Sequence, residues 1–217
     1  MKRMFRYCLV AIFLLAVSAS AFAQANKVLR SATEPNVPGG LATLYALDPL
    51  AHTLCFHDGQ NGYVVQQNEI KNRCTDLEFN SYDAGGFTVA IEGGRAGNII
   101  DLGTAGELKQ RYGYAESSLS TGQGFASIRL ENGKVVILKD QRGFQELKES
   151  AELFKPGRIK AASPIKLGHI YLVRLTDTND KSFQMLAKFV VVSYVPNESV
   201  AIRWQLFGAA SANPELK

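Results

Sequence analysis

The chain has 217 residues, a formal net charge of +4 and 20% charged residues, and this length allows one hydrophobic core or two small ones. Lys2, Arg3 and Arg6 account for three of these net charges, so the rest of the chain carries only +1. This charge balance does not indicate a nucleic acid or an anionic membrane surface as the partner.

Residues 1–23 have the three parts of a secretory signal peptide. MKRMFRY is positively charged, CLVAIFLLAV is uncharged and apolar, and Ala21-Phe22-Ala23 provides a cleavage site before Gln24. The apolar run is shorter than the roughly 20 residues that span a bilayer. We therefore predict that the mature chain is exported, to the periplasm or out of the cell, and that it has no transmembrane segment. An uncleaved anchor is the alternative.

Cys55 and Cys74 are the only cysteines after the predicted signal peptide. An even pair of cysteines in an exported protein predicts a disulfide. The bond would close a loop of 20 residues, for which the chain-entropy model gives about 3 kcal/mol of stabilisation.

The same stretch allows two other interpretations. A zinc ion could take four ligands from it, which are His52, Cys55, His57 and Cys74. HTLCFHD has the composition of a strand, and alternation along a strand would place His52 on the face opposite Cys55 and His57. A Cys55 nucleophile activated by His57 would need a reduced thiol. Because the disulfide needs neither arrangement, we predict no metal and no cofactor.

The middle of the chain has the pattern of many short strands separated by turns. The apolar or alternating runs are LATLYAL, HTLCFH, GYVVQQ, GFTVAIE, NIIDLG, FASIRL and KVVILK. Asn132-Gly133 supplies the positive φ angles of a tight hairpin turn. The pattern predicts a mainly β protein, an antiparallel β-sandwich or barrel-like fold with one or two short helices. The 38-residue offset between GFTVAIEGG and GFASIRLENG leaves a β-propeller as an alternative.

Two short helices are predicted. Thr104 and Glu107 have the spacing of a capping box before ELKQRYG, and Gly113 would end that helix. The second predicted helix is FQELKESAELF, which Lys155-Pro156 would stop.

The last third of the chain predicts a β-meander built from HIYLVRLT, FQMLAKFVVVSYV and SVAIRWQLF. FVVVSYV is apolar throughout, as expected of a central strand. One face of the last run holds Val200, Ile202, Trp204 and Leu206. This face predicts a half-buried strand with Trp204 in the core.

These elements divide the chain into four segments. They are the signal peptide (1–23), an N-terminal Gly-rich β unit with the disulfide (24–143), a helix and linker (144–163) and the C-terminal β-meander (164–217). The two β segments could also pack together as one domain.

Four acidic residues of the Gly-rich middle are candidates for catalysis: Glu92, Asp101, Glu107 and Glu116. A glycosidase needs two carboxyl groups about 5–10 Å apart, but most such acids are solvated surface groups. His169 at the start of a predicted strand is a conceivable general base, although a lone histidine there is more often structural. The glycines of IEGGRAGNIIDLG precede a strand-like run rather than a helix, which does not indicate a dinucleotide loop.

Tyr112 and Tyr114 precede the polar stretch ESSLSTGQGF. Aromatic residues beside a Ser/Thr/Gly loop suit a binding loop on a rigid β scaffold, and they also suit an ordinary surface loop. The sequence contains no catalytic motif, which favours a secreted or periplasmic, non-enzymatic binding or envelope-associated module. Its partner would be a glycan, an envelope component or a protein. The alternative is a small extracellular hydrolase that cleaves a glycan with paired carboxylates.

Overall fold

The computed structural model describes residues 39–48, 51–61, 75–79, 85–90, 95–113, 127–139, 143–155, 160–178 and 180–210. All of them belong to one compact unit, Val37–Lys217. The predicted signal peptide and the predicted strand GYVVQQ lie outside the described residues.

The described residues are mainly β, and every strand pair is antiparallel. The predicted mainly β class with two short helices is confirmed, and no closed barrel is present among the described strands. The elements are β1 (Gly39–Tyr45), β2 (Thr53–Leu54), β3 (Leu77–Phe79), β4 (Gly86–Val89), β5 (Arg95–Thr104), α2 (Ala105–Tyr112), β6 (Ile128–Glu131), β7 (Lys134–Leu138), β8 (Phe144–Glu146), the 3-10 helix η2 (Lys148–Ser150), α3 (Ala151–Phe154), β9 (Ala162–Pro164), β10 (His169–Asp177), β11 (Gln184–Val195) and β12 (Ser199–Ala210).

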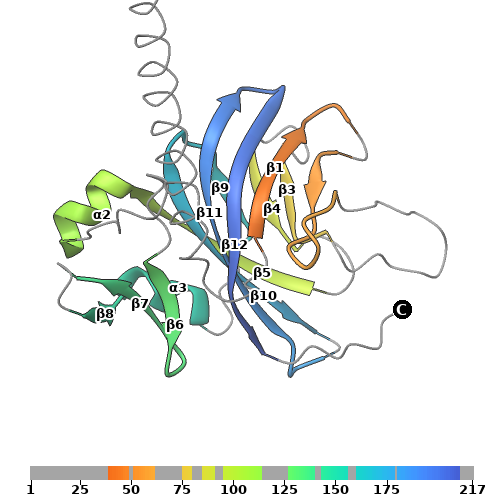
Figure 1. The fold of residues 1–217 in the computed structure, drawn as a ribbon. Helices are drawn as coiled ribbons and strands as arrows, with labels where there is room; N and C mark the ends of the chain where they lie inside the picture. Colours follow the sequence, from red (N-terminus) through yellow and green to blue (C-terminus); the bar gives the residue numbers. More distant parts are fainter. Residues whose placement is uncertain are drawn as a thin grey trace, which may run out of the picture. The chain divides into compact units, whose positions relative to one another are not determined.

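Three sheets make up the described unit (Figure 1). The central sheet has the order β1-β12-β11-β10-β5, so its two edges come from the first half of the chain and its three inner strands from the end. The second sheet has the order β2-β3-β4-β9 and the third the order β6-β7-β8. The predicted C-terminal meander thus forms the middle of the central sheet, with the apolar strand β11 at its centre.

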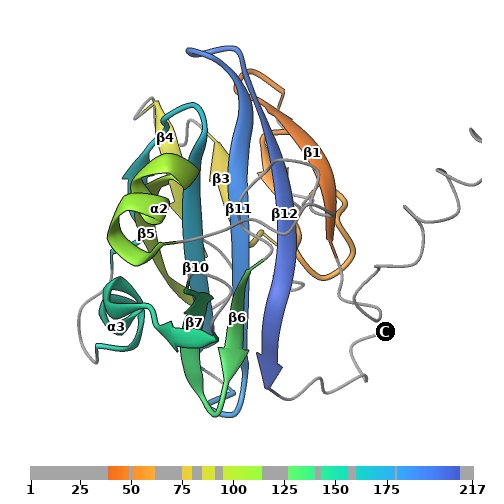
Figure 2. The ribbon, with the colours of Figure 1, turned by 60° about the vertical axis from the view of Figure 1, so that its left-hand side comes forward.

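The central sheet is covered on both faces. One core cluster lies between it and the second sheet, and another lies between it, the third sheet and helix α2. Figure 2 shows α2 on one side of β10 and strands β3 and β4 on the other. Alternate residues of β10 accordingly enter different clusters, with Tyr171 and Val173 in the first and Ile170 and Leu172 in the second. Burial on both faces requires a strand that is apolar at nearly every position, as HIYLVRLT is.

Aromatic side chains fill the middle of the first cluster. The Phe87 ring of β4 packs edge-on against Tyr171 and Phe189, with ring centroids 5.5 and 5.0 Å apart. Edge-to-face contacts of this kind add to the free energy gained from burial. The prediction that Trp204 lies in the core is confirmed, because its ring is buried and lies 5.6 Å from that of Phe56.

Local sequence signals explain the first helix and the clearest hairpin. In α2 the Thr104 hydroxyl accepts the Glu107 N–H, and the Glu107 carboxylate accepts the Thr104 N–H, so the predicted capping box is present. Gly113 ends the helix with a φ of 63°. Asn132 and Gly133 both have positive φ, 52° and 75°, in the turn between β6 and β7, as predicted.

The second predicted helix begins later than its sequence pattern indicated. Phe144–Glu146 is strand β8, paired with β7, and helical backbone starts only at Lys148. Pairing with β7 therefore outweighs the helical spacing of the apolar residues in FQELKESAELF. The propeller alternative gains no support, because the two strands of the first similar segment, β4 and β5, belong to different sheets, whereas β6 and β7 of the second segment pair with each other.

Candidate functional site

Two of the four acidic candidates lie in the described part of the chain, and they lie close together. Asp101 is on β5, and Glu107 is in the first turn of α2. Both bind the backbone that joins these elements: Asp101 Oδ1 accepts the Gly103 N–H at 2.8 Å, and Glu107 Oε2 accepts the Thr104 N–H at 2.6 Å. Glu92 and Glu116 lie outside the described residues.

Asp101 is the centre of a polar cluster at the edge of the central sheet. His169 Nδ1 lies 2.8 Å from Asp101 Oδ1, and Lys166 Nζ lies 3.0 Å from Asp101 Oδ2. Behind them the Tyr171 hydroxyl donates to the Pro164 carbonyl and accepts the Lys166 N–H. His169, which the sequence presents as a lone histidine, is therefore held in a fixed orientation by a carboxylate.

The environment of both carboxylates favours their ionised forms. Burial pushes the pKa of Asp101 upward, but the bonds from His169, Gly103 and Lys166 outweigh it and hold the pKa below the ordinary 3.8. The Thr104 backbone and hydroxyl likewise lower the pKa of Glu107. A carboxylic acid that donates a proton near neutral pH needs a raised pKa instead. These two acids therefore lack the property that the hydrolase hypothesis predicts for one member of its pair.

Replacing Asp101 with asparagine should lower thermal stability near neutral pH. The amide keeps the shape of the carboxylate but loses the charge that His169 and Lys166 bind, so we expect a loss of about 1–3 kcal/mol. The contribution of Asp101 is present above its ordinary pKa of 3.8 and is lost as the pH falls through the lower pKa of the folded protein.

The difference in melting temperature between wild type and Asp101→Asn should therefore shrink on acidification below pH 3.8. A difference that stays constant down to strongly acidic pH would assign the loss to altered hydrogen bonding by the amide rather than to charge. Glu131→Gln is a matched control, because Glu131 is an exposed acid whose contact with Arg129 is 3.4 Å long.

Tyr112 lies in the last turn of α2 rather than in a loop, and its side chain is in the core. The residue is 8% exposed and belongs to the second cluster. Its hydroxyl donates to Glu149 and accepts the Lys148 N–H at 3.3 Å. Burial, together with Glu149, raises the pKa of Tyr112 to about 12. The interpretation of Tyr112 as an exposed aromatic of a binding loop is thus corrected, because the ring anchors α2; Tyr114 lies outside the described residues.

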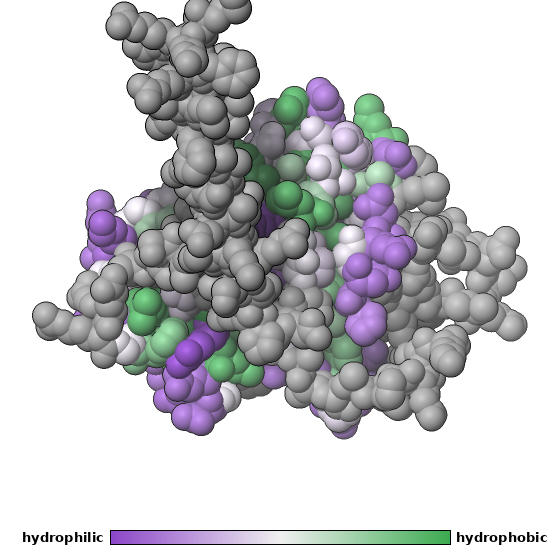
Figure 3. Space-filling model, in the orientation of Figure 1, coloured by the Kyte–Doolittle hydropathy of each residue, from purple (hydrophilic) through white to green (hydrophobic). Residues whose placement is uncertain are grey.

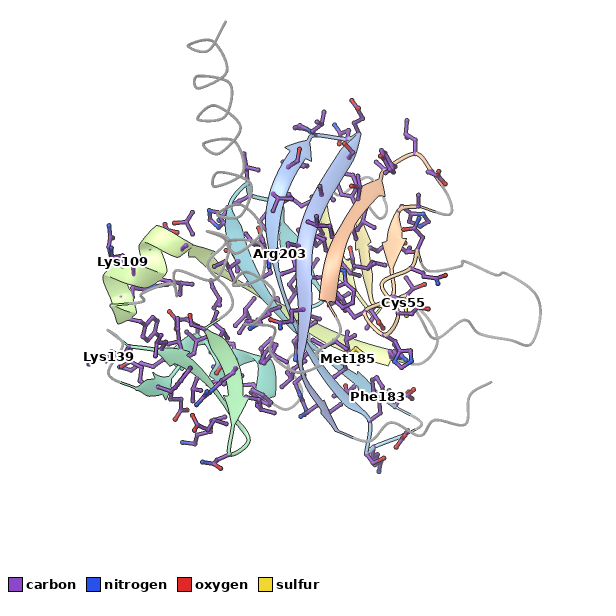
Figure 4. The ribbon with its side chains drawn as sticks, viewed as in Figure 1. Cys55, Lys109, Lys139, Phe183, Met185 and Arg203 are labelled. Atoms are coloured by element: carbon purple, nitrogen blue, oxygen red, sulfur yellow. The ribbon has the colours of Figure 1, made fainter. Side chains whose placement is uncertain are left out.

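Cys55 is buried just after β2, in a tight turn on the side of the molecule where β1 and β2 lie (Figure 4). Its N–H donates to Gln60, and its carbonyl accepts the Gly59 N–H, both at 2.9 Å. Cys74 lies outside the described residues, so the pairing of the two cysteines stays a prediction.

The ring of His52 contacts Glu78 and Asp48. Its Nε2 lies 3.2 Å from Glu78 Oε1, and its Nδ1 lies 2.9 Å from the Asp48 carbonyl. Among the described residues, no group of three or more His, Cys, Asp and Glu side chains could hold a metal ion.

A buried ion pair connects the second sheet with the central sheet. The fully buried carboxylate of Asp76 binds the Arg95 guanidinium at the start of β5 and accepts the Phe56 N–H at 2.8 Å. Burial raises the pKa of Asp76 although Arg95 and Phe56 oppose this effect. The guanidinium carbon of Arg95 also lies 4.7 Å from the ring centroid of Phe183, which precedes β11 (Figure 4). These contacts are those of a structural cross-link.

The exposed apolar side chains indicate a different kind of site. Tyr45 and Leu47, at the end of β1 and in the turn after it, are 49% and 90% exposed. Together with Asp48 and Glu198 they line a shallow, open depression. Figure 3 shows hydrophobic and hydrophilic surface side by side at this end of β1 and of the β11–β12 hairpin.

Backbone bonds fix the two turns that form this depression. The Ala46 N–H donates to the Glu198 carbonyl at 2.9 Å, and the Asp48 N–H donates to the Tyr45 carbonyl at 3.2 Å. The Asp48 carboxylate accepts the Ala51 N–H. The side chains therefore stand on a supported backbone, which suits a preformed binding site.

No family model, curated protein or solved structure matches the chain. The described residues form a mainly β, antiparallel fold. Its central sheet is covered on both faces. Within the part of the chain that the structure describes, no helix is long and apolar enough to cross a membrane.

Proposed function

We propose that the protein is an exported, non-enzymatic binding module that holds a glycan of the cell envelope or its surroundings. The site is the depression lined by Tyr45, Leu47, Asp48 and Glu198. Export follows from the predicted signal peptide, and an oxidising compartment suits the predicted disulfide between Cys55 and Cys74.

The exposure of Tyr45 beside Leu47 carries this proposal. Large apolar side chains gain free energy by leaving water, so a pair of them held in solvent on fixed turns indicates a surface that a ligand covers. A sugar ring offers an apolar face for Tyr45 and Leu47. Its hydroxyl groups can donate hydrogen bonds to the carboxylates of Asp48 and Glu198.

The charge of the depression narrows the class of glycan. Two of its four described lining residues are acids, and none of these four is basic. Like charges repel, so uronic acid or sulfated chains should bind poorly, whereas neutral and amino sugars should bind better.

The polar clusters elsewhere favour binding over catalysis. Asp101 and Glu107 are tied to backbone N–H groups with lowered pKa values, and Asp76 is paired with Arg95 in the core. Each of these acids thus has a structural role that accounts for its position. Tyr45 and Leu47 are instead exposed to solvent, so the depression that they line is the better candidate for a ligand site.

A thermal-shift panel of neutral, amino and acidic glycans tests the proposal. A bound glycan at 100 times its dissociation constant should add about 2.7 kcal/mol of stability. Tyr45→Ala should weaken binding of that glycan about two- to tenfold, since stacking on an aromatic ring contributes roughly 0.5–1.5 kcal/mol.

Tyr45→Phe keeps the ring and should retain most of the affinity, and Glu131→Gln tests an exposed acid outside the depression. If no glycan class shifts the melting temperature, or if Tyr45→Ala binds as well as wild type, the proposed site is refuted. If an envelope protein retains the exported protein and no glycan does, the partner is a protein instead of a glycan.

A further inference from the structure

On the outer side of β1, the backbone groups of Leu41 and Thr43 have no partner among the described residues. β1 is an edge strand of the central sheet, with β12 as its neighbour. The Ala46 N–H donates to Glu198, which follows the register of the β1–β12 ladder, so the even-numbered residues bond to β12. In an antiparallel ladder the residues between them turn their N–H and C=O groups to the other side. Among the described residues, no backbone bond reaches the outer side of Leu41 or Thr43.

The opposite edge of the same sheet is covered. On β5 the Ile99 N–H donates to the Lys160 carbonyl at 2.9 Å, and the Asn98 side chain donates to the Leu153 carbonyl at 3.2 Å. The segment around α3 therefore pairs with β5 from outside, which protects that edge.

β1 also lacks the residues that keep an edge strand from pairing. Proteins protect exposed edges with charged side chains, prolines or bulges. The sequence of β1 is GGLATLY, without charge or proline, and its pairing with β12 is regular. Leu41 is 73% exposed on this strand. An uncharged, regular strand with an exposed leucine is a surface that accepts another strand.

We propose that β1 pairs antiparallel with β1 of a second copy of this chain, across a two-fold axis at Leu41. In this register Leu41 lies opposite Leu41 of the second copy, and Thr43 lies opposite Gly39. The bonds use only outward-facing groups. The N–H and C=O of Tyr45, which already bind Ala51 and Asp48, lie beyond the paired residues.

The composition of the strand favours a second copy as its partner. Two identical charged strands would repel each other, whereas GGLATLY is neutral along its whole length. The two-fold register brings the two exposed Leu41 side chains into contact with each other and places the small Gly39 opposite Thr43. A pairing of this kind is isologous, so it closes with two molecules. The inference uses the strand edge and does not rest on the proposed glycan site.

Charge variants of Leu41 test the pairing in the protein as the cell processes it, by sedimentation velocity over a range of concentrations. Wild type should show a concentration-dependent dimer. Leu41→Lys and Leu41→Glu alone should each raise the dimer dissociation constant at least about tenfold, because two like charges face each other. An equimolar mixture of the two variants should dimerise again. Leu167→Lys makes the same change at another exposed leucine, 61% exposed before β10, and should leave the dimer unchanged.

Amide hydrogen exchange gives a second readout that does not depend on a variant. The N–H groups of Leu41 and Thr43 should become protected as the concentration rises, while those of Ala42 and Leu44 are protected throughout by β12. Trp204 fluorescence reports whether each variant is folded.

A monomeric wild type at every concentration would overturn the proposal, even if another protein's strand bound this edge. A dimer that survives in both charge variants would place the interface elsewhere and would equally overturn it. The glycan panel with Tyr45→Ala gives a separate result, so each proposal can fail alone.

Discussion

Replacing Arg95 with methionine should lower the free energy of unfolding by about 3–5 kcal/mol. The variant leaves the fully buried carboxylate of Asp76 with the Phe56 N–H but without its cation. Removing one partner of a buried ion pair is much more damaging than removing both, because an uncompensated charge stays in a medium of low polarity. Urea unfolding followed by Trp204 fluorescence measures the loss.

The loss should depend on pH and on the second partner. Burial already raises the pKa of Asp76 in the wild type. In the variant, protonation therefore relieves the buried charge, and stability should rise as the pH falls through the raised pKa toward the ordinary 3.8. Asp76→Asn combined with Arg95→Met removes the charge and should recover part of the loss. The contrary result is a double variant that loses as much unfolding free energy as Arg95→Met and Asp76→Asn lose together. In that case the packing of Arg95 on Phe183, rather than the charge, is responsible.

Reduction of the predicted disulfide should lower the free energy of unfolding by about 2–5 kcal/mol. The expected bond joins Cys55 to Cys74 and shortens the unfolded chain, which raises the free energy of the unfolded state. Thiol titration of the exported protein should find neither cysteine reactive until a reductant is added. Cys55→Ala combined with Cys74→Ala should have the stability of the reduced wild type.

The double alanine variant also serves as the control for the reductant. A reductant that lowers the melting temperature of wild type should not change that of the variant. Two titratable thiols in the native exported protein would refute the disulfide, and zinc binding by the reduced protein alone would favour the four-ligand alternative.

The local elements of the fold could be predicted where short-range rules decide them. The capping box at Thr104 and Glu107, the turn at Asn132-Gly133 and the alternation around Trp204 all depend on residues within a few positions. In FQELKESAELF the same rules gave the wrong start of the helix, because Phe144–Glu146 bonds to β7 instead.

The polar clusters could not be predicted, because strand pairing brings distant residues together. Asp101 meets His169 only because β5 pairs with β10, 68 positions along the chain. Asp76 meets Arg95 because the second sheet packs on the central one. Tyr112 had a usable signal that the loop interpretation passed over: it lies four residues after Leu108, on the same face of α2, and both are buried.

The place of β1 in the central sheet has a consequence for the timing of folding. β1 begins at Gly39, but its ladder partner β12 begins only at Ser199, and β5 likewise depends on β10. Both edges of the sheet therefore remain without a partner until the last third of the chain is available, which is a topology that folds slowly. The proposed export would deliver the N-terminus first, so β1 and β5 would cross the membrane before the strands with which they pair. The sheet closes only after the end of the chain has arrived.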